Sequence, residues 1–169
     1  MQTGDWISLA SVIMVFLGAV WAFIQWQHSI KLKKSEFILQ FVKELRYDKE
    51  IVNTMYIIEY DPNWYNNDFH GGKDEYNVDK FLSLLNYICY MRKMKLLSEN
   101  EFKVLRYEIR RTCISPSAQS YLWNLYHFSR KMSSPCSFEY LIDYGLGNNY
   151  FYPEFANPNS GRYKKLLNF

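Results

Sequence analysis

Residues Trp6–Trp26 read WISLASVIMVFLGAVWAFIQW and decide the organisation of this 169-residue chain. The stretch contains no charged residue, and its only polar side chains are Ser8, Ser11 and Gln25. A helix of this length rises about 31 Å, close to the ~30 Å thickness of a hydrocarbon core. A tryptophan stands at each end, where amphipathic indole rings suit the membrane interface. The stretch therefore predicts a transmembrane helix.

Two other interpretations of this stretch are weaker. A core helix of a soluble domain usually carries polar residues along one side, which this stretch lacks. A cleaved signal peptide needs a basic start, a short apolar segment and a small-residue cleavage site. The chain begins MQTGD instead, and Ala19–Ala22 places bulky residues where small ones are needed. We therefore expect a retained signal-anchor.

A basic collar, Gln27–Lys34, follows the apolar stretch. Its cations are Lys31, Lys33 and Lys34. The positive-inside rule then predicts a single-pass protein of the inner membrane, with the N-terminus outside and the rest of the chain in the cytoplasm. Three lysines fall short of the cluster of about four to eight that indicates specific lipid recognition, so we expect them to set topology.

The rest of the chain is long enough for one domain with its own core. We predict an anchor and collar over residues 1–30, a cytoplasmic helical domain over 31–145 and a C-terminal tail over 146–169 packed on that domain. The three cysteines, Cys89, Cys113 and Cys136, lack metal-ligand spacing and are expected to be buried small hydrophobes. A net charge of +3 does not indicate nucleic-acid binding.

Apolar residues at three- and four-residue steps predict the fold class. It is all-α: one N-terminal transmembrane helix, a small bundle of about five helices and an irregular aromatic tail. The expected helices lie within residues 35–58, with a break near Tyr47, and within 78–97, 98–113, 117–132 and 135–145. The residues expected to start or end them are Asp48, Ser98 with Glu101, Ser115-Pro116, Ser134-Pro135 and Gly145. His127 lies among aromatic residues and is expected to be a hydrogen-bonded structural residue.

The segment Asp61–Asn77, DPNWYNNDFHGGKDEYN, is the clearest predicted loop. Carboxylates near a histidine could bind a divalent ion or do acid–base chemistry, but no metal-ligand spacing and no nucleophile accompany His70. Three interpretations stay open: a catalytic or metal site, a partner-contacting loop and a plain solvated connector. The candidate contact residues are Trp64, Tyr65, Asp68, Phe69 and His70. We predict no catalytic residue, metal ligand or cofactor.

The order of these parts resembles a bacterial family of short membrane proteins, the domain of unknown function 4760. The comparable motifs are Leu85-Asn86-Tyr87 and the Ser98–Glu101 helix start, within a resemblance that covers about residues 6–130. Members often carry a glutamate just after the first motif, where this chain has Ile88 and Cys89. The resemblance implies the architecture and no established activity.

Two functions follow as expectations. The first is a non-enzymatic, membrane-anchored protein that binds a protein partner, or itself, at the cytoplasmic face; by analogy it would act as a regulator or in phage defence in bacteria. The alternative is a membrane-perturbing effector whose single span oligomerises. Gly18 and Ala22 form a small-xxx-small pair, which permits close approach of two helices in a membrane.

Overall fold

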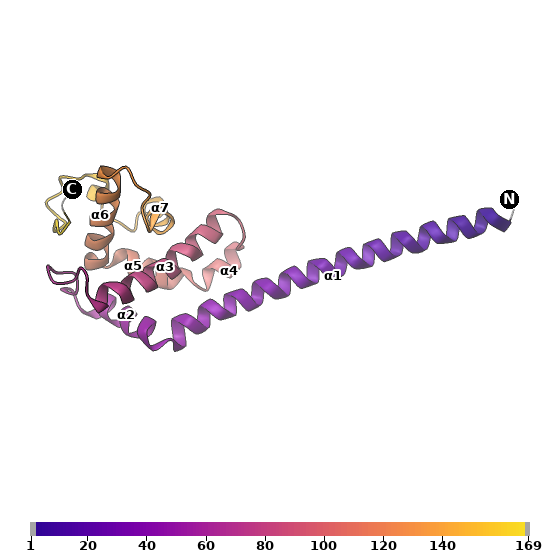
Figure 1. The fold of residues 1–169 in the computed structure, drawn as a ribbon, viewed down its shortest axis with the longest axis horizontal. Helices are drawn as coiled ribbons and strands as arrows, with labels where there is room; N and C mark the ends of the chain where they lie inside the picture. Colours follow the sequence, from indigo (N-terminus) through magenta and orange to yellow (C-terminus); the bar gives the residue numbers. More distant parts are fainter. Residues whose placement is uncertain (1–2, 168–169) are drawn as a thin grey trace. The chain divides into compact units, whose positions relative to one another are not determined.

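A computed structural model describes residues 3–167, which form seven α-helices and one 3₁₀ turn and contain no strand (Figure 1). The all-α fold class is therefore confirmed: one long apolar N-terminal helix precedes a helical bundle. The chain divides into two compact units, one ending at Phe41 and one beginning at Val42. We call the second unit the helical body.

The first unit is a single stretch of α1 (Thr3–Tyr47). The helix continues through the basic collar because residues 27–47 contain no proline or glycine to interrupt it. Within the described chain, α1 is the one helix long and apolar enough to cross a membrane. Side chains at positions 10–29 are exposed along it.

The helical body contains the break that the sequence predicts. α1 ends at Tyr47, and α2 (Lys49–Tyr60) starts behind the cap Asp48, whose carboxylate accepts from the backbone N–H groups of Glu50 at 2.9 Å and Ile51 at 3.2 Å. The pKa of Asp48 is lowered most by the hydrogen bond from Ile51, and also by the Lys80 ammonium 3.1 Å away and the bond from Glu50. The predicted cap is confirmed.

α3 (Lys73–Lys93) starts five residues before the predicted helix, so the predicted loop Asp61–Asn77 is shorter than expected. Asp74 and Glu75 lie in its first turn, where carboxylates favour the positive end of the helix dipole. The helix ends in a Schellman pattern: the Leu96 N–H donates to the Met91 carbonyl at 2.9 Å, while Lys95 adopts a left-handed φ of 57°.

The predicted capping box of Ser98 and Glu101 is confirmed, but the single helix predicted behind it is two. α4 (Glu99–Lys103) ends before a break at Val104 and Leu105, and α5 (Arg106–Ile114) follows. Across this break the chain still buries a set of apolar residues: Phe102, Leu105, Ile109 and Cys113.

α6 (Pro116–Lys131) begins where predicted, behind Ser115, whose hydroxyl donates to the Ile58 carbonyl of α2 at 3.0 Å instead of capping α6. Ser134-Pro135 was expected to start the next helix, but α7 (Glu139–Gly147) begins after Phe138. Gly145 does not close α7; the left-handed position after that helix is Asn149, with φ 55°.

The core forms around α3, which packs against α2 and α7. Apolar residues at three- and four-residue steps along α3 are buried; they include Phe81, Leu82, Leu85, Ile88, Cys89 and Met91. Cys113 is buried as well, whereas Cys136 is only half-buried, so the prediction of three buried cysteines is wrong for that residue. Burial raises the pKa of the Cys89 thiol to about 12.

Gly145 is needed for close packing. A Cβ at this position would lie 2.5 Å from the Phe151 ring, whereas a Cβ at Gly147 would meet no atom within 4 Å. We expect Gly145→Ala to lower the free energy of unfolding by about 1–3 kcal/mol through overpacking. Gly147→Ala, the matched control, should be neutral or slightly stabilising. Urea unfolding measures both, and equal effects of the two substitutions would contradict this role.

The residues after α7 bond to α6. Gln119 donates to the Tyr150 carbonyl at 3.1 Å, Asn124 donates to the Lys164 carbonyl at 2.7 Å, and His127 Nε2 lies 3.0 Å from the Phe155 carbonyl oxygen. The tail contributes a 3₁₀ turn, η1 (Pro153–Ala156), which carries the fully buried Phe155. Polar side chains of one helix therefore bond to the irregular backbone that follows it.

His127 should make stability depend on pH. Burial lowers its pKa from the ordinary 6.5, with Arg130 and Lys165 acting in the same direction and the bond to Phe155 opposing. At pH values between the lowered pKa of folded His127 and about 6.5, the unfolded chain binds more protons than the folded chain. The free energy of unfolding therefore rises with pH through this range. We expect a lower urea midpoint at about pH 5.5 than at about pH 7.5, with a smaller difference in His127→Gln. If the urea midpoint of His127→Gln changed with pH as much as that of the unsubstituted chain, His127 would not be the cause of the pH dependence.

Candidate functional site

The predicted span residues lie on α1. Gly18 and Ala22 are one turn apart, both are exposed, and a Cβ at Gly18 would meet no atom within 4 Å. Trp26 is exposed near the end of the apolar stretch, and the collar lysines Lys31, Lys33 and Lys34 follow on the same continuous helix. The side chain of Trp6 lies outside the described residues.

The loop between α2 and α3 gathers its aromatic residues around Tyr121 of α6. The ring centroids of Trp64, Tyr65 and Phe69 lie 5.9, 5.1 and 5.3 Å from that of Tyr121. Only 6, 3 and 5% of these three residues is exposed. Their rings therefore anchor the loop to the body and do not form an exposed contact surface, while Asp68 lies exposed.

The half-buried His70 is held at both ring nitrogens. Its Nδ1 lies 2.7 Å from a Glu75 carboxylate oxygen and its Nε2 lies 3.2 Å from the Tyr65 hydroxyl. The second Glu75 oxygen accepts from the Gly71 backbone N–H. The structure thus brings together one carboxylate of the predicted cluster with the histidine.

A second carboxylate lies behind this group. The Tyr121 hydroxyl donates to Asp79 at 2.6 Å, and burial raises the pKa of Asp79. Burial also raises the pKa of Tyr65 and of Tyr121 well above the ordinary tyrosine value. Both hydroxyls therefore stay protonated at neutral pH, and that of Tyr121 donates its hydrogen bond to Asp79.

The hydrogen bonds among Tyr65, His70 and Glu75 are better suited to stabilising the loop than to catalysis. A nucleophile is activated by a lowered pKa or by a base that takes its proton, whereas burial raises the pKa of Tyr65. Among residues 3–167, no group of three or more histidine, cysteine or acidic side chains could hold a metal ion.

The outer face of the loop is polar and ordered. Asp61 accepts from the Asn63 N–H at 2.8 Å, and Asn66 accepts from the Asp68 N–H at 3.0 Å. Such side chain-to-backbone bonds replace the missing helix or strand bonds. These bonds give the outer face of the loop a defined local structure.

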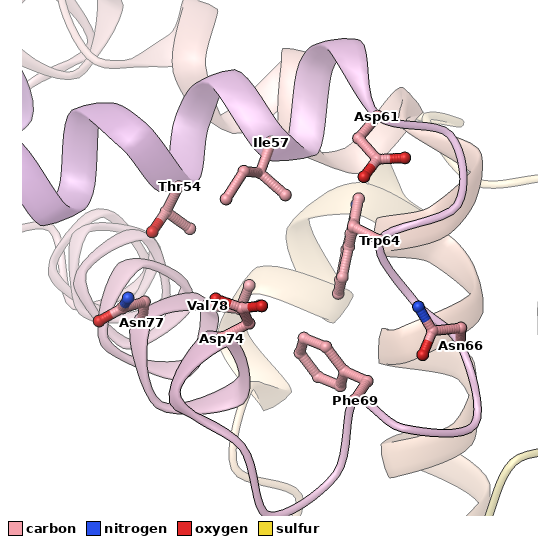
Figure 2. A pocket seen from close by; sticks show the side chains of 9 residues that line it. All are labelled: Thr54, Ile57, Asp61, Trp64, Asn66, Phe69, Asp74, Asn77 and Val78. Atoms are coloured by element: carbon pink, nitrogen blue, oxygen red, sulfur yellow. The ribbon is translucent and has the colours of Figure 1, made fainter.

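A pocket of 160 Å³ opens between this loop, the end of α2 and the start of α3 (Figure 2). Its lining residues are Thr54, Ile57, Asp61, Trp64, Asn66, Phe69, Asp74, Asn77 and Val78. The lining includes two carboxylates and no basic side chain. The buried Trp64 indole N–H has no hydrogen-bond acceptor in the described structure. We call this the acid–tryptophan pocket.

A second surface is absent from the sequence-based predictions. A groove of 340 Å³ lies where the end of α1, α2 and α5 meet within the helical body. Tyr56, Tyr60 and Tyr107 line it and are 59, 68 and 62% exposed. We call these three residues and their groove the tyrosine groove. The i, i+4 spacing of Tyr56 and Tyr60 was a signal for it, but Tyr107 comes from another helix.

The floor of the tyrosine groove is charged. Arg111 contacts Glu59 at 2.9 Å and Glu108 at 3.7 Å. One oxygen of Glu108, a buried residue, has no hydrogen-bond partner in the described structure. The groove therefore brings together tyrosine and arginine, two residues that are enriched at binding hot spots.

No protein-family model, curated protein or solved structure matches this chain. The resemblance to the domain of unknown function 4760 therefore stays a prediction, and the function rests on the chain's own residues.

Proposed function

We propose that this chain is a non-enzymatic, membrane-anchored protein that binds a protein partner through its helical body at the cytoplasmic face of a bacterial inner membrane. The observation that carries the proposal is the exposed, uncharged surface of α1 over residues 10–26, joined on one chain to a folded body. Exposed apolar side chains over that length are costly in water and favourable in lipid. The lysines that follow support the orientation.

The tyrosine groove supports the partner-binding half of the proposal. Tyrosine and arginine combine a large contact area with hydrogen-bonding groups. They are enriched at hot spots, the interface residues whose substitution by alanine costs the most binding free energy. The groove offers three exposed tyrosines around the Arg111–Glu59 ion pair. A protein surface with apolar side chains and one hydrogen-bonding group fits this composition.

Site-specific photocrosslinking in intact cells tests the groove. A photoreactive residue in place of Tyr107 should give one discrete adduct, and Tyr60→Ala should reduce its yield about ten-fold by removing a neighbouring contact. Tyr76→Ala removes a tyrosine of similar exposure, 66%, from outside the groove and should leave the yield unchanged. An adduct unaffected by Tyr60→Ala would contradict binding in the groove. An adduct of twice the chain's mass would identify the partner as a second copy.

One observation favours the alternative function, a membrane-perturbing oligomer. Gly18 and Ala22 leave an open face on α1, at which a second helix could approach closely. If the span acts this way, Gly18→Leu should abolish collapse of the membrane potential on expression, whereas Ala19→Leu, on a neighbouring face, should not. A collapse that survives Gly18→Leu would remove the basis of this alternative.

A further inference from the structure

The acid–tryptophan pocket has a charge that its surroundings do not neutralise. Asp61 comes from the end of α2 and Asp74 from the first turn of α3, and Figure 2 shows both carboxylates beside the same space. Within residues 3–167, neither carboxylate forms an ion pair. Since no basic side chain lines the pocket, it favours a cation.

The walls of the pocket select the kind of cation. Trp64 and Phe69 contribute aromatic rings, whose centroids lie 5.1 Å apart. Aromatic faces attract ammonium groups, whereas divalent ions favour sites with several carboxylates; this lining has two, and the described residues hold no group of three or more histidine, cysteine or acidic side chains that could bind a metal. The pocket of 160 Å³ is also smaller than sites for drug-sized molecules, which are about 300–1,000 Å³. A small organic ammonium ion fits these features.

Trp64 adds a requirement for an oxygen atom. Trp64 is 6% exposed, lines the pocket in Figure 2, and has an indole N–H without an acceptor. Leaving a buried donor unpaired is unfavourable, so a ligand that accepts from it gains relative to one that does not. The best ligand therefore carries an acceptor close to its ammonium group.

We propose that the acid–tryptophan pocket binds a small primary ammonium compound with a hydroxyl or carbonyl oxygen two or three bonds from the nitrogen. The ammonium lies by Asp61 and Asp74, and the oxygen accepts from the Trp64 indole. Both a free amino alcohol and the N-terminal residue of a peptide have this chemistry. The proposal goes beyond the proposed function, because it requires neither the membrane helix nor the tyrosine groove.

Nuclear magnetic resonance of the detergent-solubilised full chain tests it. The Trp64 indole N–H signal, assigned with Trp64→Phe, is followed at about pH 7 and constant ionic strength during titration with three compounds of similar size: ethanolamine, propylamine and ethylene glycol. We expect ethanolamine to bind about ten-fold more tightly than ethylene glycol and about three-fold more tightly than propylamine. Equal responses to ethanolamine and ethylene glycol would overturn the proposal.

Two variants separate the pocket from general surface charge. Asp61→Asn with Asp74→Asn keeps the shape of both side chains and one acceptor oxygen on each but removes both charges, and should weaken ethanolamine binding about ten-fold. Asp68→Asn removes an exposed carboxylate of the same loop from outside the pocket and should leave binding unchanged. The other tryptophan signals report whether each variant stays folded. Unchanged affinity in the folded double variant would also overturn the proposal.

A further titration distinguishes the two sources of the ligand. A trialanine amide with a free N-terminus is compared with its N-acetylated form, which has no ammonium group. Tighter binding of the free peptide than of ethanolamine, lost on acetylation, would support the proposal and assign the site to a peptide N-terminus. Binding of ethanolamine alone would support it and assign the site to a free amine. Equal binding of both peptides would contradict recognition of the ammonium group.

Discussion

Phe155→Ala lowers the free energy of unfolding of the helical body by about 3–5 kcal/mol, the cost of deleting a fully buried aromatic ring. Phe155 is 0% exposed; its ring stacks on Phe151 at 4.4 Å and also contacts Tyr126 and Tyr163. The substitution therefore opens a cavity where the tail meets α6. Equilibrium urea unfolding, followed by far-ultraviolet circular dichroism, measures the change.

A matched aromatic substitution checks that this loss comes from burial. Tyr107→Ala removes a ring that is 62% exposed and should change the free energy of unfolding by less than about 0.5 kcal/mol. A change of under about 1 kcal/mol for Phe155→Ala would contradict the packing of the tail on the body, because a loosely attached tail contributes little to stability.

Val15→Lys with Leu17→Lys moves the chain from the membrane fraction to the soluble fraction. Both residues lie near the middle of the apolar stretch and are exposed on α1. A lysine at the centre of a membrane helix costs about 2.5–3.5 kcal/mol for insertion, so two cost about 5–7 kcal/mol. The ratio of membrane-bound to soluble protein, measured after expression, checks this prediction.

The control adds the same two charges elsewhere on the same helix. Leu32 and Leu39 are also exposed on α1, but they lie in or beyond the basic collar. Leu32→Lys with Leu39→Lys should leave the protein in the membrane, since lysines at that level can reach the head groups. Retention of both double variants in the membrane fraction would contradict insertion of the apolar stretch.

Much of the fold was predictable from short-range sequence patterns. Asp48 and the pair Ser98 and Glu101 bond to backbone groups within three residues, so their spacing alone identifies helix starts. Long-range packing produced the errors. Gly145 looked like a helix end, but its position inside α7 is required by Phe151, a residue of the following tail.

In the candidate sites, too, local features were predictable from the sequence and long-range contacts were not. The loop Asp61–Asn77 was recognisable from its composition, but the burial of its aromatic rings depends on Tyr121, which comes from a helix far along the chain. The tyrosine groove likewise joins α2 and α5. Periodicity along one helix does not reveal which side chains of a second helix complete a groove.

The most direct test of the central claim, an inner-membrane anchor with a cytoplasmic body, is protease protection of the full chain in spheroplasts after alkaline washing of the matching membranes. The account predicts that the chain resists alkaline extraction, that its body survives protease added outside, and that the body is digested once the cells are lysed. Release by the alkaline wash, or digestion of the body in intact spheroplasts, would contradict it.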